Sequence, residues 1–350
     1  MERGSGKGAL GQRGAALHLE PQSHCAQDGE PRLMQIGFNL PNSGPLSAVA
    51  TMTEIATEGE AMGFDYLTVT DHVVLPDTKV PGYPYSESGE FYEDAPTERH
   101  EQLLGMAYIA AKTSRIRLVA AVMVVPHRPA VLAAKMLATL DVLSGGRLVV
   151  GVGAGWLKTE FDAVVTTPFP ERGPVTDEYI DAFRALWTER APRFAGRYTN
   201  FDGIVLEPKP VQRPHPPIWI GGESGPSVRR AARVGDLWYP IGSNNKHLLD
   251  TLPRLRAGIA RLRQATIDAG RDPASVGVGY RVKRYGAVVP PVASDGQRRL
   301  FSGSEADIIE DLRALRDVGI TAIDIDFGRP NAAAMIAEMR RFQAAVIEKI

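Results

Sequence analysis

The chain repeats one local pattern between residue 35 and residue 347: a short apolar run, a loop, and a run with helical periodicity. Eight such units fit the sequence. Strands that alternate with helices favour a parallel sheet, because each parallel connection needs a long crossover. A doubly wound open sheet rarely needs eight strands, so the pattern predicts an α/β fold of the (β/α)8 TIM-barrel type. The active site of such a barrel lies at the carboxyl ends of the strands.

The apolar runs place the expected strands at 35–40, 66–70, 117–125, 147–152, 217–220, 236–240, within 276–289, and at 322–327. Helices are expected at 47–62, 98–113, 129–143, 176–188, 226–234, 247–269, 305–318 and 331–347, with a short one at 157–163. An insertion follows the fourth strand, and a long loop, 73–96, follows the second. Long loops inside compact domains are usually functional, so both are expected at the site.

The composition is that of an ordinary globular protein, with 44% hydrophobic and 23% charged residues and a net charge of -1. The basic residues are spread out, so nothing indicates binding to nucleic acid or to a membrane surface. No apolar run is long enough to span a bilayer. The single cysteine, Cys25, excludes a disulfide within the chain and fits a cytoplasmic location.

Residues 1–33 are rich in Gly, Gln and charge and show no strand or helix period. They also lack the apolar core of a signal peptide. We expect a disordered or wrongly assigned leader at 1–33, and one barrel domain at 34–350. Cys25 lies in the leader, which disfavours a catalytic thiol.

Glycines dominate the end of the fourth strand, in Gly151-Val-Gly-Ala-Gly-Trp156. Glycine at a strand end lets backbone approach a ligand closely. The spacing is not the GxGxxG of a dinucleotide site, and no acidic residue follows where the ribose contact would fall. The glycines therefore predict either close approach of the backbone to a flat ring or a tight turn. Trp156 is either a wall of the pocket that would hold such a ring or part of the core.

Two polar stretches follow other expected strands. Asp71 and His72 end the second strand, where a histidine suits proton transfer to or from a substrate oxygen. The alternative is a structural hydrogen-bonded pair. The turn from Gly221 through Gly222 and Glu223 to Ser224 precedes a helix, where backbone N–H groups would bind a phosphate. Ser224 could instead only cap that helix.

Three further signals are given less weight. His100-Glu101 resembles the start of a zinc motif, but position 104 is leucine. Asp324 and Asp326 alternate with apolar residues, and we expect a hydrogen-bonded interior pair there. His215 stands among prolines and is expected at the surface.

Several motifs in order resemble the bacterial luciferase-like oxidoreductases over residues 34 to about 330. They are Arg115–Leu118, Lys135–Arg147, Gly151–Trp156, Glu171–Gly173, Asp177–Ile180, Phe201–Gly203, Glu207–Gln212 and Pro216–Gly222. The segment from Asp71 to Pro76, followed by Tyr83-Pro-Tyr85, is similar to the branch thought to use the deazaflavin coenzyme F420 rather than FMN.

The resemblance implies a barrel whose mouth holds the tricyclic ring. The matching positions are Ala121 and Val122 for a cis peptide bond behind the ring, Ala154, Gly155 and Trp156 for the loop beside it, and Gly221, Gly222, Glu223 and Ser224 for the phosphate turn. Asp71 and His72 match positions that contact the deazaflavin and exchange protons. The resemblance implies no metal ligand. It also implies that the protein forms a homodimer.

The leading hypothesis is an F420-dependent oxidoreductase that passes a hydride between the deazaflavin and a small organic substrate, with His72 handling the proton. The loop 73–96, with Tyr83, Tyr85 and Tyr92, would close over the substrate. An alternative is an FMN-dependent monooxygenase served by a separate flavin reductase; a third is a barrel that binds without turnover. The long anionic tail of F420 would favour basic residues near the site, such as Arg128 or Arg229.

Overall fold

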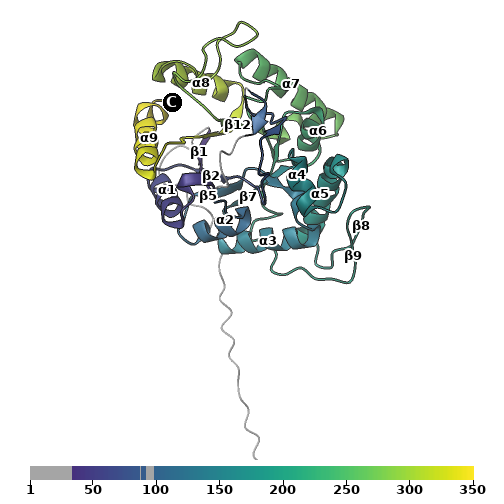
Figure 1. The fold of residues 1–350 in the computed structure, drawn as a ribbon. Helices are drawn as coiled ribbons and strands as arrows, with labels where there is room; N and C mark the ends of the chain where they lie inside the picture. The colour runs from purple at the N-terminus through teal and green to yellow at the C-terminus, as the bar shows by residue number, and fades with distance from the viewer. Residues whose placement is uncertain (1–33, 87, 92–97) are drawn as a thin grey trace, which may run out of the picture. The chain divides into compact units, whose positions relative to one another are not determined.

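The computed structural model describes residues 34–350 except residue 87 and residues 92–97. The leader expected at 1–33, Cys25 and Tyr92 therefore lie outside the described residues. In the described part, a ring of strands is surrounded by helices (Figure 1). No helix of this part is both long enough and apolar enough to cross a membrane.

Eight parallel strands close into a barrel, because β10 pairs with β7 as well as with β11 and because β13 pairs with β1. In chain order they are β1 (Gln35–Asn39), β2 (Tyr66–Val69), β5 (Arg117–Ala120), β7 (Leu148–Gly153), β10 (Ile218–Gly221), β11 (Leu237–Tyr239), β12 (Gly277–Val282) and β13 (Ile320–Ile325). The (β/α)8 barrel that the sequence predicts is confirmed.

A helix follows each barrel strand and packs outside it. The eight are α1 (Val49–Ala61), α2 (Gln102–Ala110), α3 (Ala130–Leu143), α5 (Arg172–Thr188), α6 (Gly225–Val234), α7 (Leu252–Asp268), α8 (Glu305–Asp317) and α9 (Ala332–Ala345). The largest shift from the expected boundaries is at α7, which begins at Leu252 rather than near 247. Pro253 explains this start, since proline is favoured in the first turn of a helix.

Long connections follow three of the strands. The loop after β2 carries the small hairpin β3 (Val80–Pro81) and β4 (Glu90–Phe91). The insertion after β7 carries the short helix α4 (Lys158–Val164) and a second hairpin, β8 (Phe194–Ala195) and β9 (Asn200–Phe201). The third runs from 283 to 304, so the strand expected within 276–289 is limited to β12.

The prediction of a single strand over 117–125 is wrong for its second half. It ends at Ala120, and the peptide bond between Ala121 and Val122 is cis. The next two residues form β6 (Met123–Val124), which pairs with β7. The N–H of Val124 donates to the carboxylate of Asp71 at 2.8 Å, so a side chain from β2's end replaces the strand partner that Val124 would need.

Glycines at the ends of β7 and β10 make room for this interrupted strand. A Cβ on Gly153 would lie 2.5 Å from Cγ2 of Val122, and one on Gly221 would lie 2.7 Å from its Cγ1. A Cβ on Gly151 would overlap the carbonyl oxygen of Ala120. At these glycines, therefore, the group that comes close to the backbone is another part of the same chain, and not the ligand that the sequence suggested.

Large aromatic side chains fill the barrel below this level. The ring of Tyr66 occupies the space that a side chain on Gly37 would need. Trp219 packs edge-on against Tyr66 with centroids 5.4 Å apart, and Tyr239 lies 5.6 Å from Trp219. The barrel is therefore a packed core, and a site can open only at its mouth.

We expect Gly151→Ala to lower the free energy of unfolding by roughly 1–3 kcal/mol or more, because its methyl group meets backbone rather than a movable side chain. Gly105→Ala is the control, since its methyl group would have no neighbour nearer than 3.9 Å. On helix α2 it should raise stability by about 0.5–1 kcal/mol. Urea denaturation measures both; an unchanged midpoint for Gly151→Ala would contradict the packing described above.

Candidate active site

His72 stands at the carboxyl end of β2 and is held by a buried carboxylate. Its Nδ1 lies 2.8 Å from Oε2 of Glu160 on α4, and Glu160 is only 2% exposed. Oε1 of Glu160 also accepts the N–H of Val73 at 2.5 Å. Because an ionised carboxylate only accepts, Nδ1 is assigned the proton and Nε2 keeps its lone pair. No described residue bonds Nε2, so this nitrogen can exchange a proton with a ligand.

An aromatic cluster covers the mouth next to His72. The ring of Phe91 lies 5.5 Å from His72, and it packs against Tyr83 and Trp156 with centroids 5.1 and 5.2 Å away. Tyr83 and Trp156 are 5.0 Å apart. Of the two alternatives for Trp156, a wall of the mouth is the one that this position supports.

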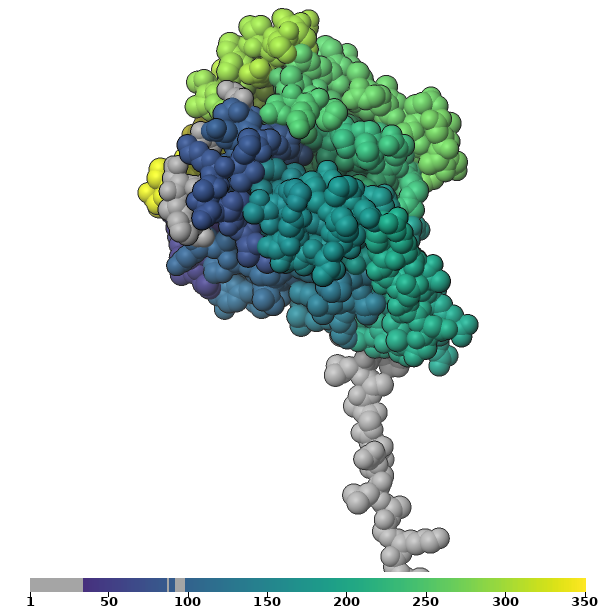
Figure 2. All heavy atoms as spheres, turned by 45° about the vertical axis from the view of Figure 1, so that its right-hand side comes forward, coloured from purple at the N-terminus to yellow at the C-terminus, as the bar shows by residue number. Residues whose placement is uncertain are grey.

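The other strand ends anchor the loop that carries Tyr83 and Tyr85. Pro84 accepts the N–H of Asn245 at 2.7 Å, and Nζ of Lys283 lies 3.2 Å from Oη of Tyr83. Figure 2 shows the blue atoms of this loop at the surface beside the green atoms of the segment that follows β11. The described part of this loop, 73–86 and 88–91, therefore contacts the segments that follow β11 and β12, and is called the lid below.

Asp71 faces the interior rather than the lid. It is 4% exposed, and its two oxygens accept from Nη1 and Nη2 of Arg128 at 2.9 and 3.0 Å. Arg128, expected near the entrance, is itself buried and also pairs with Glu101, the cap of α2. Burial lowers the pKa of Arg128, but the hydrogen bonds and charges of Asp71 and Glu101 outweigh it and raise that pKa. Arg128 therefore stays charged, and its contacts with Asp71 hold the interrupted third strand.

A second histidine, His127, lies buried near this network. It is 7% exposed, and its Nδ1 has no hydrogen-bond partner in the described structure. Burial lowers the pKa of His127, against the charges of Glu160 and Asp71, so its imidazole is neutral at neutral pH. Neither His127 nor Glu160 is among the site residues predicted from the sequence: Glu160 lies inside α4, and His127 follows the expected third strand without a pattern that marks it.

The turn between β10 and α6 has the features of an anion site. Gly222 has φ of +99°, and Ser224 caps α6 by accepting the N–H of Ser227 at 3.4 Å. The hydroxyls of Ser224 and Ser227 are 3.0 Å apart. Arg229 is exposed one turn after Gly225, and its Nη1 lies 3.2 Å from where a Cβ on Gly225 would stand. Unpaired N–H groups, hydroxyls and a cation at a helix start suit a phosphate.

Glu223 belongs to the same turn, but its carboxylate points away from the helix start. It accepts from the hydroxyl of Tyr85 at 3.2 Å, from the N–H of Ile241 at 2.6 Å, and from the amide of Asn244. Burial raises the pKa of Glu223 to about 7, although these hydrogen bonds act to lower it. The side chain thus ties the lid to the loop after β11.

The remaining residues expected at the cofactor lie at the same end of the barrel. Ala121 is buried, whereas Val122, Ala154, Gly155 and Trp156 are half-buried. Gly155 has φ of +85°, which favours glycine. The structure brings these residues together with His72, but their contact with a cofactor stays a prediction.

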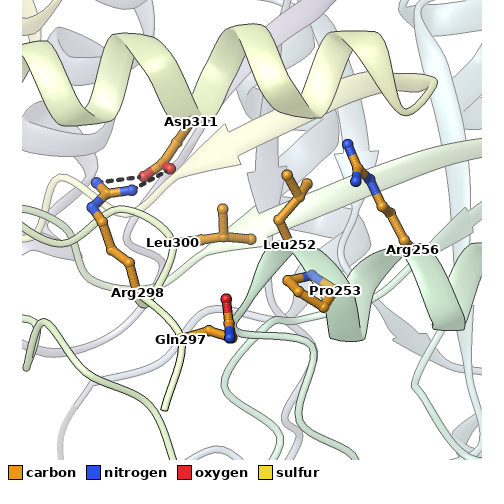
Figure 3. Close-up of a pocket in the computed structure, with 7 residues that line it drawn as sticks. All are labelled: Leu252, Pro253, Arg256, Gln297, Arg298, Leu300 and Asp311. Carbon is orange, nitrogen blue, oxygen red and sulfur yellow. Dashed lines mark hydrogen bonds and ion pairs between the residues drawn. The ribbon is translucent and has the colours of Figure 1, made fainter. Parts of the chain in front are cut away.

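A pocket away from the mouth lies between α7 and α8. Its lining residues are Leu252, Pro253, Arg256, Gln297, Arg298, Leu300 and Asp311, none from a barrel strand. Figure 3 shows Arg298 turned to Asp311, with bonds of 2.6 and 3.0 Å. This pair fastens the 297–302 segment to α8, and the candidate site remains the barrel mouth.

We expect the raised pKa of Glu223 to appear in the pH dependence of stability. Between pH 4.5 and 7 the folded protein binds more protons at this group than the unfolded chain, so its contribution to the free energy of unfolding falls as pH rises through this window. Relative to Glu223→Gln, the wild type should lose on the order of 1–3 kcal/mol over it. Urea denaturation across pH tests this, with exposed Glu348→Gln as control; parallel curves for wild type and Glu223→Gln would refute it.

Comparison with known proteins agrees with the barrel fold described above. The family model described as luciferase-like monooxygenase matches residues 34–287. An FMNH2-dependent dimethylsulfone monooxygenase of Pseudomonas putida is 31% identical over 265 residues, which span 64% of this chain and 73% of that protein. An uncharacterised protein of Mycobacterium tuberculosis is 31% identical over 268 residues, which span 76% of this chain and 86% of that protein.

A solved structure shares the fold at lower identity. An F420-dependent secondary alcohol dehydrogenase in complex with an F420-acetone adduct superposes with a TM-score of 0.70 and 19% identity, over 89% of this chain and 99% of that one. At this identity the likeness concerns the fold alone. The family match covers most of the described barrel, and the chain belongs to the luciferase-like monooxygenase family.

Proposed function

We propose that this protein is a coenzyme F420-dependent oxidoreductase that transfers a hydride between the deazaflavin and a small organic substrate. The pairing of His72 with buried Glu160 carries the proposal. Hydride transfer to a C=O or C=N bond leaves charge on the heteroatom, which then needs a proton. Nε2 of His72 is the available group at the strand ends for that transfer.

The residues at the mouth fit a coenzyme with a flat ring and a phosphate tail. Ser224, Ser227 and the first turn of α6 would hold the phosphate, with Arg229 beside it. The ring would lie near Val122 and Trp156, where the wall is apolar. When bound, the deazaflavin supplies or accepts the hydride, whereas the protein provides orientation and keeps water out.

Glu160 and the lid determine how His72 works. The buried carboxylate 2.8 Å from Nδ1 orients the ring, so that Nε2 is left for proton exchange with a ligand. The aromatic cluster of Tyr83, Phe91 and Trp156 would shield the reacting atoms from water. Asp71 would act on the site only by holding the chain around it.

A second candidate is an FMNH2-dependent monooxygenase that works with a separate flavin reductase. The named relative from Pseudomonas putida supports it. The burial of Arg128 also supports it, since of the two arginines suggested for the long F420 tail only Arg229 is exposed. A homodimer remains a proposal under either function.

Titration with oxidised and reduced coenzyme F420 and FMN, followed by fluorescence or calorimetry, distinguishes the two. We expect F420 to bind at least tenfold more tightly than FMN, because its longer tail would bring more negative charge to Arg229 beside the phosphate turn. Arg229→Gln should reduce that preference, while Arg233→Gln on the same helix should leave it unchanged. FMN binding alone would overturn the F420 assignment in favour of the monooxygenase.

We expect His72→Ala to lower kcat by about 10²–10⁴-fold, the range typical of a removed general acid or base, with coenzyme affinity nearly unchanged. Glu160→Gln should also lower kcat, by less than His72→Ala, because the carboxylate that orients the His72 ring is removed. His215→Gln, ahead of β10 at the other end of the barrel, is the control. Full activity of His72→Ala would remove His72 from the mechanism.

A further inference from the structure

The lid crosses the barrel mouth instead of following its rim. It leaves the ring at β2, yet its residue Pro84 accepts the N–H of Asn245, which follows β11, at 2.7 Å. In the closed order of barrel strands, β11 lies four places from β2 in either direction, so it is the strand opposite. The hydroxyl of Tyr83 lies 3.2 Å from Nζ of Lys283 after β12, while its ring lies 5.0 Å from that of Trp156 after β7. A side chain that reaches both sides lies across the opening.

The covalent ends of this loop lie together on one side of the mouth. The chain enters it from β2, where the N–H groups of Val73 and Val74 donate to Glu160 at 2.5 and 3.4 Å. It leaves the loop at Arg99, which bridges to Ser43 after the neighbouring strand β1. The far part, residues 83–86, is therefore the tip of the lid, and hydrogen bonds to the segments after β10, β11 and β12 hold it. Because the other side is covalently joined to the ring, opening has to begin at the tip.

Two ionisable side chains of the ring hold the tip. Glu223, which is 4% exposed, accepts from the hydroxyl of Tyr85 at 3.2 Å. Nζ of Lys283 donates to the hydroxyl of Tyr83 at 3.2 Å and to the carbonyl oxygen of Tyr85 at 3.4 Å. The same ammonium lies 5.1 Å from the centroid of the Tyr83 ring, within range of a cation–π contact. Hydrogen bonds to ionised groups are stronger than those between neutral groups, so these contacts contribute most to holding the tip.

With the tip held, aromatic rings of the lid stand beside His72. The ring of Phe91 lies 5.5 Å from His72 and 5.2 Å from Trp156, and Tyr83 lies 5.1 Å from Phe91. These rings exclude water, but a ligand that exchanges a proton with Nε2 of His72 has to pass them. An enzyme with its site at this mouth therefore needs the lid to open and close in each catalytic cycle.

We propose that Glu223 and Lys283 form a latch for the tip of the lid, and that loss of either contact opens the barrel mouth while the barrel itself stays folded. The opening uncovers Trp156 and His72 together, because the rings of Tyr83 and Phe91 move away with the tip. The latch controls access to the mouth and works in the same way for either coenzyme, so it goes beyond the proposed function.

Amide hydrogen exchange, measured by NMR on the full chain without ligands, tests the latch. The N–H of Asn245 is bonded to the carbonyl of Pro84 in the tip, so it becomes free to exchange when the tip leaves. The N–H of Val124 is bonded to Asp71 within the barrel and serves as the internal reference for unfolding of the whole domain. In the wild type we expect Asn245 to be protected, but less strongly than Val124.

Two variants remove the latch contacts one at a time. Tyr85→Phe loses the bond to Glu223 but keeps the ring, and Lys283→Met loses the ammonium but keeps most of the aliphatic chain. Each should speed exchange at Asn245 by about 3–10-fold, the effect of one lost hydrogen bond, and leave Val124 unchanged. Tyr285→Phe is the matched control, since it also removes a bond from a hydroxyl to a carboxylate, at 2.5 Å to Glu338 on α9. It should leave exchange at Asn245 unchanged.

Quenching of tryptophan fluorescence by acrylamide reports whether the mouth opens with the tip. Trp156 is half-buried, whereas the other tryptophans are buried: Trp187, Trp219 and Trp238. An opened lid should therefore raise the quenching constant through Trp156. We expect a rise in both latch variants and none in Tyr285→Phe, and the additional substitution Trp156→Phe should abolish it.

Equal exchange at Asn245 in the wild type and both latch variants would overturn the inference. Acceleration of Val124 by the same factor as Asn245 would also overturn it, because the contacts would then stabilise the whole barrel. Faster exchange at Asn245 with unaltered quenching would mean that the tip loosens over a mouth that stays closed, which contradicts the proposed opening. These measurements use no coenzyme, so their failure leaves the proposed function to be decided by the coenzyme titration alone.

Discussion

The buried ion pair between Asp71 and Arg128 is the interaction on which the mouth of this barrel depends. It joins the end of β2 to the segment after the interrupted third strand, and the same carboxylate takes the N–H of Val124. Removing one partner of a buried pair typically costs about 3–5 kcal/mol, because the other charge is left unpaired. The next residue, His72, is fixed by Glu160 of α4, the short helix that follows β7. The adjacent residues Asp71 and His72 are thus bound to two different parts of the chain, Asp71 to Arg128 and His72 to Glu160.

The lid depends on a different set of contacts, at the opposite side of the mouth. Glu223 and Lys283 hold Tyr85 and Tyr83 from the ends of β10 and β12. Since Glu223 lies in the turn proposed to bind the phosphate, any shift of that turn on binding would be felt by the lid. Under the proposed function, coenzyme binding at this turn would therefore be linked to the position of the lid through Glu223.

The sequence predicts the architecture well because the eight-fold alternation is a local pattern, and the closed barrel follows from it. It fails at 117–125, where the apolar run continues past Ala120 although the strand does not. It also fails where partners are distant: Glu160 is 88 residues from His72, and no local signal joins them. Strand-end logic identifies Asp71 and Glu223 as site residues, but their side chains point into the protein, a direction that sequence spacing does not encode.

The glycine-rich end of β7 shows why motif and role must be separated. Gly151 and Gly153 are required by Ala120 and Val122 of the same chain, so their presence would be explained without any ligand. The side chain of Val122 is then left facing the mouth. Because it is apolar, it would not distinguish the ring of F420 from the ring of FMN. Under the proposed function, discrimination between F420 and FMN would therefore come from the tail, at the start of α6. There, of the two arginines considered for that tail, only Arg229 is exposed, and this single charge is what a longer anionic tail would have to use.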